Sequence, residues 1–351
     1  MSVDKFIIDG REIGSQHAPY IVAEMSANHN GRLEQAFAIL EAAKKAGADA
    51  IKIQTYRADT LTIDCDNDDF KIHSGLWEGK TLYQLYESAF TPWEWHKPLF
   101  ERASELGITM FSSPFDRSAV DLLEDLNAPA YKIASFELVD IPLIEYVAST
   151  GKPLIMSTGM ANQDEIAEAV DAARAHGCEQ LLLLQCVSAY PARPEDYNLR
   201  TMADIQQRFG TSVGLSDHTL SPTTALAAVA LGAVLIEKHF TLDRQGGGPD
   251  DSFSMEPADL AQLCEQSRTV WQALGSANYQ RRASEQDNMV FRRSLYVVKD
   301  LALGDVFNEE NLKSIRPGYG LAPKHYPEVI GKTANKDIKA GTRFDWSLMK
   351  P

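Results

Sequence analysis

Two histidines, His218 and His239, stand at the ends of consecutive strand-like segments of the sequence. The segments run from Ser212 to Ser216 and from Val234 to Glu237, and an apolar-periodic stretch typical of a helix separates them. This order predicts a βαβ unit, whose parallel strands lie about 4.8 Å apart, so that side chains at both strand ends can bind one cation. The alternative is that both are ordinary loop histidines hydrogen-bonded to carbonyl groups.

The predicted cation would have two neutral imidazoles as ligands. They leave coordination positions open for water and for a substrate oxygen, a mixed shell that suits Mn²⁺, Mg²⁺, Co²⁺ or Zn²⁺. The sequence therefore predicts a divalent cation without fixing its identity. Asp217, next to His218, could be a ligand, a group that orients a ligand, or a turn former, and we leave it out of the predicted site.

Polar side chains also end the other strand-like segments. A single lysine in such a place, Lys52 or Lys132, could extend its ammonium to solvent. Two lysines beside several hydroxyl groups are instead what a phosphate and a carboxylate on one small molecule require. The hydroxyl residues are Ser135, Ser157 and Ser216, and the further strand-end residues are Glu24, Gln54, Ser113, Glu137 and Tyr190. The pattern predicts metal-assisted chemistry on a small phosphorylated acid.

Eight strand-like segments recur along the chain, most of them joined by amphipathic stretches such as LEQAFAILEAAKKAG and NQDEIAEAVDAARAHG. Eight βα repeats predict an α/β fold of the TIM (β/α)8 barrel type, which places catalytic groups at the carboxyl ends of its strands. A doubly wound open sheet is the alternative, but its frequent GxGxxG turn is missing. The segments are Tyr20–Glu24, Ala50–Gln54, Thr109–Ser113, Ala130–Ser135, Leu154–Ser157, Leu181–Gln185, Ser212–Ser216 and Val234–Glu237.

A long segment from Tyr56 to about Trp95 follows the second strand. It is rich in aromatic residues and far longer than a structural connection in a barrel needs, so it predicts a lid or a specificity wall. Its TLYQLYESAF portion also fits an ordinary amphipathic helix, and both interpretations can hold together. His73 and His96 have no paired ligand spacing and are interpreted as structural.

The composition excludes several classes of function. With 351 residues the chain is long enough for a barrel and a further module, and its net charge of −15 argues against binding nucleic acid or an anionic membrane surface. No basic and apolar leader opens the sequence, and no run of about 18 apolar residues occurs. The cysteines are widely spaced, so we expect reduced thiols in a cytoplasmic protein. They are Cys65, Cys178, Cys186 and Cys264.

The C-terminal part predicts a second, small domain. We expect the barrel over residues 1–278, a polar linker over 279–290 and the second domain over 291–351. The pattern KDxxxGxxF occurs at Lys299 and again at Lys336, which predicts a pseudo-symmetric module with a limited core. Between the repeats, Arg316 precedes Pro317 and Gly318 and could serve recognition or simply be exposed.

The motifs AEMSANHNG, AIKIQTY, FSSPF, AYKIAS, STGM, GLSDHTL, EKHFTLD and SIRPGYG occur in this order and resemble the sialic acid synthase family, from about Ile21 to the C-terminus. Their combination is far more specific than any one motif. SANHN, FKI before GLW, TLYQLYESA followed by TPWEWH, and DDSFSMEP are most similar to the pseudaminic-acid-forming branch. The resemblance implies a TIM barrel followed by a small antifreeze-like (SAF) domain in a domain-swapped homodimer.

The same resemblance implies an activity and a site. The activity is condensation of phosphoenolpyruvate with 2,4-diacetamido-2,4,6-trideoxy-L-altrose, with C–O cleavage and a divalent cation. His218 and His239 match the metal ligands, Arg316 matches an arginine that reaches the partner's barrel, and Ser188 replaces an asparagine of neuraminate-forming members, which favours another sugar. Lys52, Lys132, Ser135, Ser157 and Ser216 match positions that hold phosphoenolpyruvate, and Glu24, Gln54, Glu137, Tyr190 and Asp250 match positions that face the sugar or the attacking water.

The implied mechanism starts with polarisation of the sugar aldehyde by the cation, followed by attack of the phosphoenolpyruvate C3 and capture of C2 by water. Glu24 or Glu137 could deprotonate that water, while Lys52 and Lys132 favour departure of phosphate. The alternatives are a sister synthase for legionaminic or N-acetylneuraminic acid, a metal-dependent TIM-barrel hydrolase, and a non-catalytic glycan- or ice-binding protein. A hydrolase typically has a richer His/Asp/Glu ligand set, and a binding protein leaves the strand-end lysines and glutamates unexplained.

Overall fold

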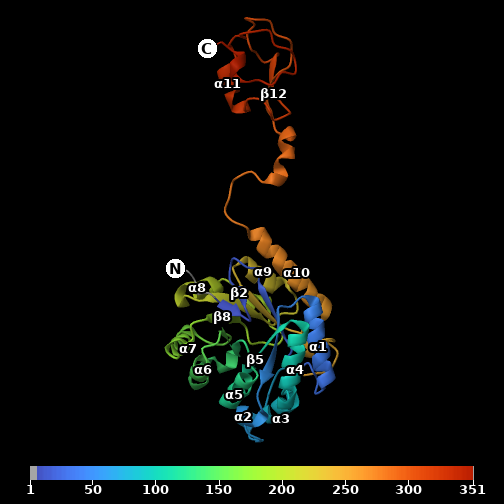
Figure 1. Ribbon diagram of the computed structural model, residues 1–351, viewed down its shortest axis with the longest axis vertical. Helices are drawn as coiled ribbons and strands as arrows, with labels where there is room; N and C mark the ends of the chain where they lie inside the picture. Colours follow the sequence, from blue (N-terminus) through green and yellow to red (C-terminus); the bar gives the residue numbers. More distant parts are fainter. Residues whose placement is uncertain (1–5, 351) are drawn as a thin grey trace. The chain divides into compact units, whose positions relative to one another are not determined.

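The computed structural model describes residues 6–350 (Figure 1). The chain divides into two compact units, Met1–Gly275 and Ser276–Pro351. The division falls three residues before the end of the predicted barrel domain and places the predicted linker in the second unit. The outer ends of the two predicted domains, residues 1–5 and 351, lie outside the described residues.

The first unit is a closed barrel of eight parallel strands, which confirms the predicted fold (Figure 1). Each strand pairs with the next along the chain, and the last pairs with the first. The eight observed strands coincide with the predicted segments to within a few residues. They are β3 (Tyr20–Glu24), β4 (Ala50–Thr55), β5 (Thr109–Pro114), β6 (Tyr131–Ile133), β7 (Leu154–Ser157), β8 (Leu181–Cys186), β9 (Ser212–Asp217) and β10 (Leu235–His239).

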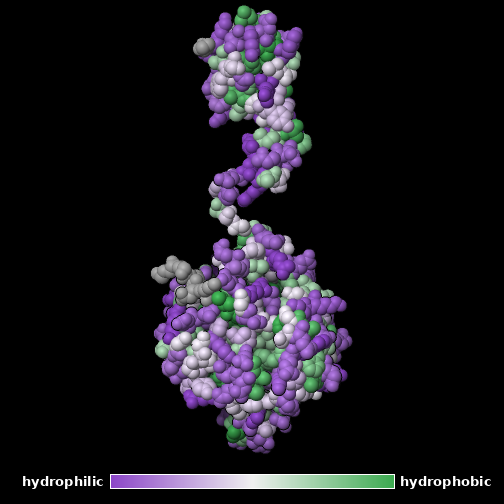
Figure 2. All heavy atoms as spheres, in the orientation of Figure 1, coloured by the Kyte–Doolittle hydropathy of each residue, from purple (hydrophilic) through white to green (hydrophobic). Residues whose placement is uncertain are grey.

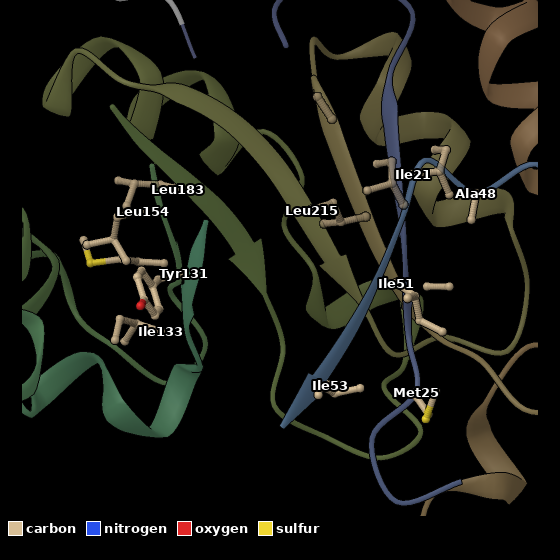
Figure 3. Packing of buried hydrophobic residues seen from close by; sticks show 14 of the residues in the cluster. Ile21, Met25, Ala48, Ile51, Ile53, Tyr131, Ile133, Leu154, Leu183 and Leu215 are labelled. Atoms are coloured by element: carbon tan, nitrogen blue, oxygen red, sulfur yellow. The ribbon is translucent and has the colours of Figure 1, made fainter. Parts of the chain in front are cut away.

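Helices follow the strands and cover the outside of the barrel. In α7 (Gln163–Ala175), Asn162 caps the first turn, and buried Ile166, Ala169, Val170 and Ala173 form one apolar stripe at helical spacing. That stripe joins the cluster that fills the space between helices and strands, part of which Figure 3 shows. The other helices are α1 (Leu33–Ala46), α4 (Trp93–Leu106), α5 (Arg117–Asp125), α6 (Ile141–Ala148), α8 (Thr201–Phe209), α9 (Thr223–Ala230) and α10 (Pro257–Leu274).

A hairpin that the sequence patterns did not predict precedes the barrel. Its strands are β1 (Phe6–Ile8) and β2 (Arg11–Ile13), joined at Asp9 and Gly10, whose positive φ angles of 51° and 76° suit a tight turn. Phe6, Ile8 and Ile13 pack against the apolar side chains of the barrel interior at the amino-terminal end of the strands. The buried charged side chains of the interior, Glu24, Lys52, Lys132 and Glu237, lie toward the opposite, carboxyl end of the strands.

The long segment after β4 contains α2 (Ala58–Leu61), a 3₁₀ turn (Asp68–Phe70) and α3 (Leu82–Ala89). The helix predicted in TLYQLYESAF is confirmed, and Thr81 and Gln84 form its capping box. His96, in α4, is buried and its Nε2 lies 2.8 Å from Thr55 Oγ1, in agreement with a structural role. His73 is exposed and contacts Asp68.

The second unit contains β11 (Ser294–Val297), β12 (Leu312–Ile315) and the short α11 (Tyr326–Val329). Its two KDxxxGxxF repeats pair with one another: Leu301 and Ile338 exchange backbone hydrogen bonds of 2.8 Å. Asp300 accepts from the N–H of Ala340, and Asp337 accepts in the equivalent way from Leu303, each at 2.8 Å. Phe307 and Phe344 meet edge to face at 5.1 Å between ring centroids. The predicted internal symmetry is therefore real.

The surface in Figure 2 is largely hydrophilic, with scattered apolar side chains. Over residues 6–350, no helix combines the length and the apolar character needed to cross a bilayer. All four cysteines are free thiols.

Candidate active site

The two-residue period of the strands separates an inner from an outer set of side chains. Along β3, Tyr20 and Val22 belong to the interior apolar cluster, and Glu24 continues that side at the carboxyl end. The register then makes inner residues direct neighbours: Glu24 pairs with Lys52 on one side and with His239 on the other, and Gln54 pairs with Ser113. Ser216 pairs with Glu237 in the same way. The predicted strand residues thus form one polar layer.

Two lysines and two glutamates form the centre of this layer, and all four are at least 95% buried. Lys52 Nζ lies 2.8 Å from Glu24 Oε2 and 3.8 Å from Glu237 Oε1, and it donates to Ser113 Oγ at 3.2 Å. Lys132 Nζ lies 3.9 Å from the same Glu237 oxygen and donates to the carbonyl of Ile133. Two ammoniums therefore face two carboxylates.

Burial and mutual attraction act in opposite directions on these groups. Burial raises the pKa of Glu24, although Lys52 opposes this shift. Burial also lowers the pKa of Lys132. Burial alone would raise the pKa of Glu237, but the charges of Lys132 and Lys52 bring it below its usual value. Of the two carboxyl groups, Glu24 is the one that takes up a proton more readily when a further anion arrives.

Hydroxyl groups gather beside this centre. Gly159 donates its backbone N–H to Ser135 Oγ at 3.2 Å, and a β carbon at Gly159 would come within 2.7 Å of that oxygen and 2.3 Å of Ser188 Oγ. Within residues 6–350, the buried hydroxyls of Ser157 and Ser188 have no hydrogen-bond partner. Ser216 donates to Glu237 at 3.4 Å. A glycine that leaves room next to unpaired hydroxyls is suited to a ligand rich in acceptors, such as a phosphate.

The two histidines lie together, with ring centroids 5.3 Å apart. His218 Nδ1 lies 2.8 Å from the carbonyl of Val187, so Nδ1–H donates to that carbonyl. Burial acts to lower the pKa of His218, but the neighbouring Cys186 raises it above its usual value. His239 Nδ1 is buried, has no hydrogen-bond partner in the described part of the chain, and lies 3.8 Å from Asp250 Oδ2. Burial, with the neighbouring His218, lowers the pKa of His239 well below its usual value, so this imidazole is neutral.

These donors fit a divalent cation that takes its remaining ligands from substrate and water. Across the described residues, 6–350, no group of three or more His, Cys, Asp or Glu side chains is arranged to hold a metal ion. The two imidazoles, of which that of His239 is neutral and has an unpaired buried nitrogen, therefore supply a partial coordination shell. The alternative interpretation, a histidine bonded to a carbonyl, accounts for one nitrogen of His218 and for neither nitrogen of His239.

The side of the layer next to the histidines carries amide, carboxylate and aromatic groups. Gln54 Nε2 donates to Glu24 at 2.9 Å and to Ser26 Oγ at 3.0 Å, and Ser26 in turn donates to Asp250. Tyr190 packs on His218 with ring centroids 4.5 Å apart and on Phe253 at 5.1 Å. This arrangement offers both hydrogen bonds and an apolar wall to a sugar.

The long segment after β4 reaches this wall. Its Trp77 lies 5.7 Å from the Tyr190 ring and donates its indole N–H to the carbonyl of Pro249 at 3.1 Å, next to Asp250. The segment therefore both contains a packed helix and borders the site.

Glu137 lies in a 3₁₀ turn (Ser135–Val139) directly after β6, and its Oε2 is buried without a hydrogen-bond partner among residues 6–350. Burial raises the pKa of Glu137 to about 7, against the lowering effect of Lys132.

A base must be ionised, so if Glu137 is the base, kcat/KM should fall about tenfold per pH unit below pH 7. A pH profile of phosphate release checks this, and Glu137→Gln should lose both rate and inflection. An unchanged acid limb in that variant would assign the base to Glu24 instead.

The structure brings nearly all of the predicted residues to one end of the barrel. Arg316 belongs to the second unit, where its guanidinium lies 6.0 Å from the Phe291 ring centroid. Ser188 lies among the hydroxyls next to Gly159.

Sequence reasoning missed two members of the layer, Glu237 and Ser26. Glu237 stands two residues before His239, and this spacing could have indicated that both side chains point into the barrel. Ser26 has a φ of 46° in the loop after β3, which no pattern in the sequence indicates.

Comparison with known proteins agrees with this geometry. The model of the NeuB family matches residues 39–279, and that of the SAF domain matches residues 292–348. The chain belongs to the NeuB family. It is 46% identical to the pseudaminic acid synthase of Campylobacter jejuni serotype O:2 over 92% of this chain and 94% of that protein. It is 38% identical to the N,N'-diacetyllegionaminic acid synthase of the same organism, over 91% and 96%.

A solved structure of the family shares this fold. The crystal structure of N-acetylneuraminic acid synthetase from Leptospira borgpetersenii, in complex with citrate, aligns with a TM-score of 0.73 at 31% identity. The alignment covers 83% of this chain and 96% of that chain. The NeuB family model matches residues 39–279 of the present chain, and this range contains every strand of the barrel except β3, which carries Glu24. The SAF range contains Arg316.

Proposed function

We propose that this chain is a pseudaminic acid synthase. It condenses phosphoenolpyruvate, water and the open-chain form of 2,4-diacetamido-2,4,6-trideoxy-L-altrose, and it releases phosphate. The observation that carries the proposal is the buried layer in which two lysines and unpaired serine hydroxyls lie beside the paired imidazoles of His218 and His239. The choice of sugar is supported by the higher identity to the pseudaminic acid synthase than to the legionaminic acid synthase of one organism.

Phosphoenolpyruvate is the ligand for which the centre of the layer is suited. Lys132, Ser135, Ser157 and Ser216 are the groups for its phosphate, with the N–H of Gly159 beside them. Lys52 and Ser113 are the groups for its carboxylate. The ammoniums already face Glu24 and Glu237, so binding of a further anion favours proton uptake by Glu24, whose pKa burial raises.

His218 and His239 would hold the divalent cation, and Mn²⁺, Mg²⁺ or Co²⁺ suits this donor set. Such a cation, when bound, supplies Lewis acidity toward the aldehyde oxygen of the sugar. Gln54, Asp250 and Tyr190 orient the sugar from the histidine side, because they form a connected group around His239. Trp77 and Phe253 exclude water next to Tyr190.

The bonds balance as follows. C3 of phosphoenolpyruvate bonds to C1 of the sugar, the aldehyde oxygen takes a proton, water adds to C2, and the C2–O bond to phosphate breaks. Glu137 accepts the proton of that water, since its buried Oε2 has no other partner in the described chain and burial holds its pKa at about 7. Lys132 stabilises the departing phosphate.

The proposal includes an assembly and a place in the cell. The chain forms a domain-swapped homodimer in which Arg316 serves the barrel of the partner subunit, and the enzyme works in the cytoplasm. The fixed SIRPGYG turn and the small core of the SAF domain support the first point.

A panel of sugars tests the function. The enzyme is incubated with phosphoenolpyruvate and Mn²⁺, and phosphate release is measured with the diacetamido-trideoxy-L-altrose, with the sugar precursor of legionaminic acid and with N-acetylmannosamine. We expect kcat/KM to be highest for the first sugar and phosphate release to need a sugar. A preference for another sugar would assign the chain to a sister synthase. Phosphate release without sugar, or hydrolysis of unrelated esters, would support a hydrolase.

A further inference from the structure

Directly behind the two histidines lies a buried ion pair that the proposed reaction does not use. Lys238 and Asp217 are register partners on β10 and β9, and each immediately precedes one of the histidines. Lys238 Nζ lies 3.0 Å from Asp217 Oδ2, and the two side chains are 1% and 0% exposed. By the alternation along the strands, they lie on the outer side of the barrel when His218 and His239 point inward.

The pair closes the turn that carries His218. Lys238 Nζ also donates to the carbonyl of Thr219 and, at 3.5 Å, to that of Ser221. Asp217 Oδ1 accepts from the backbone N–H of Thr219 at 2.9 Å. Asp217 and Thr219, which flank His218, are therefore linked to each other and to the ammonium of Lys238.

Within this closed turn His218 has little freedom. Its backbone N–H donates to Tyr197 Oη at 2.7 Å, and its Nδ1–H donates to the carbonyl of Val187 at 2.8 Å. The bond at Nδ1 fixes the plane of the ring, so Nε2 is the nitrogen that faces a cation. His239, in contrast, has no hydrogen bond at Nδ1 within residues 6–350, so its position depends on the backbone of β10 and hence on Lys238.

Stability alone does not explain such a pair. Taking two charges out of water is costly, and apolar side chains of similar size are often equally good or better for stability. The neighbouring outward-facing residues of β9 and β10, Leu215 and Ile236, are apolar, and the charges of Arg244 and Asp259 also act on Lys238. A pair kept there has a use that apolar packing does not supply, namely one fixed geometry.

We propose that the buried Lys238–Asp217 pair positions the imidazoles of His218 and His239 at the separation that binds a divalent cation. The inference rests on the proposed metal site. Lys238 and Asp217 are positioning residues in it, because they act through the histidines and touch neither substrate nor cation.

Cobalt titration of the metal-free full-length enzyme tests the inference, with visible absorption as the readout of affinity and ligand geometry. We expect Lys238→Met and Asp217→Asn to weaken Co²⁺ and Mn²⁺ binding about ten- to hundredfold and to change the Co²⁺ bands. Activity should recover largely at saturating Mn²⁺, because the residues that contact substrate are intact. The double variant Asp217→Leu/Lys238→Met leaves no unpaired charge and should fold with the same loss of affinity.

Val229→Ala is the matched control, since it removes buried volume from α9 in the same region without touching the pair. It should lower the melting temperature and leave the Co²⁺ dissociation constant unchanged. Variants of the pair that bind Co²⁺ with wild-type affinity and spectrum would overturn the inference, and so would failure of all three to fold, since the pair would then be a requirement of the fold. A wild-type enzyme that binds neither Co²⁺ nor Mn²⁺ would instead reject the metal site of the proposed function.

Discussion

Replacing His239 by alanine is expected to reduce kcat at least about a thousandfold while the barrel stays folded. The imidazole is neutral, buried and without a hydrogen-bond partner at Nδ1 in the described chain, so its removal costs a proposed metal ligand and no structural bond. Loss of Lewis-acid activation raises the barrier by several kcal/mol, and each ~1.4 kcal/mol is a factor of ten in rate. Phosphate release at saturating substrates and Mn²⁺ gives the rate, and thermal unfolding reports the fold.

Two controls accompany this variant. His73→Ala removes an exposed histidine of the long segment and should leave activity unchanged. Chelation of the wild-type enzyme should abolish turnover, and added Mn²⁺ or Co²⁺ should restore it. Wild-type activity that survives exhaustive chelation, or a His239→Ala enzyme with near-normal kcat, would remove the cation from the mechanism.

The barrel was predictable because its signals are local. Each strand is a short apolar run next to an amphipathic helix, and the eight runs alone indicate the closed sheet. The pairing of His218 with His239 was predictable for the same reason, since consecutive strands of a barrel are neighbours. Both inferences need only the order of elements along the chain.

Glu237 was missed because its role depends on the exact register and extent of β10. The sequence pattern ended this strand at Glu237, whereas the strand continues to His239, so that both residues share the inner face. The contacts of Glu237 with Lys52 and Lys132 also join strands that are not neighbours in the sheet. A contact across a barrel follows from closure in three dimensions and leaves no periodic trace in the sequence.

The hairpin of β1 and β2 was missed for a different reason. Two strands of three residues each are too short for alternation to stand out from composition. The hairpin is stabilised by packing of Phe6, Ile8 and Ile13 on the barrel interior rather than by its own propensity. The SAF repeats show the opposite case, because a pattern repeated at 37 residues is visible in the sequence and predicts the internal symmetry that the pairing of Leu301 with Ile338 displays.

Arg316→Ala and Glu137→Ala are each expected to be nearly inactive, and mixing them is expected to restore activity. Removing a guanidinium that contacts a buried polar group typically costs about 2–5 kcal/mol, and removing Glu137 takes away the proposed base. If Arg316 serves the partner's barrel, a mixed dimer has one site with both defects and one site with neither. Arg343→Ala, which removes another exposed arginine of the same domain, is the matched control and should keep full activity.

The size of the recovery distinguishes the two arrangements. Equal amounts and random exchange make about half of all dimers mixed, and half of the sites in those dimers are intact, so about a quarter of the wild-type activity should return. If Arg316 serves its own barrel, every site keeps one defect, and mixing restores nothing. The measurement is phosphate release after co-refolding of the two variants, with mass spectrometry of isotopically labelled subunits to verify exchange. Verified exchange without recovery would reject the domain-swapped dimer and leave Arg316 to act within its own subunit.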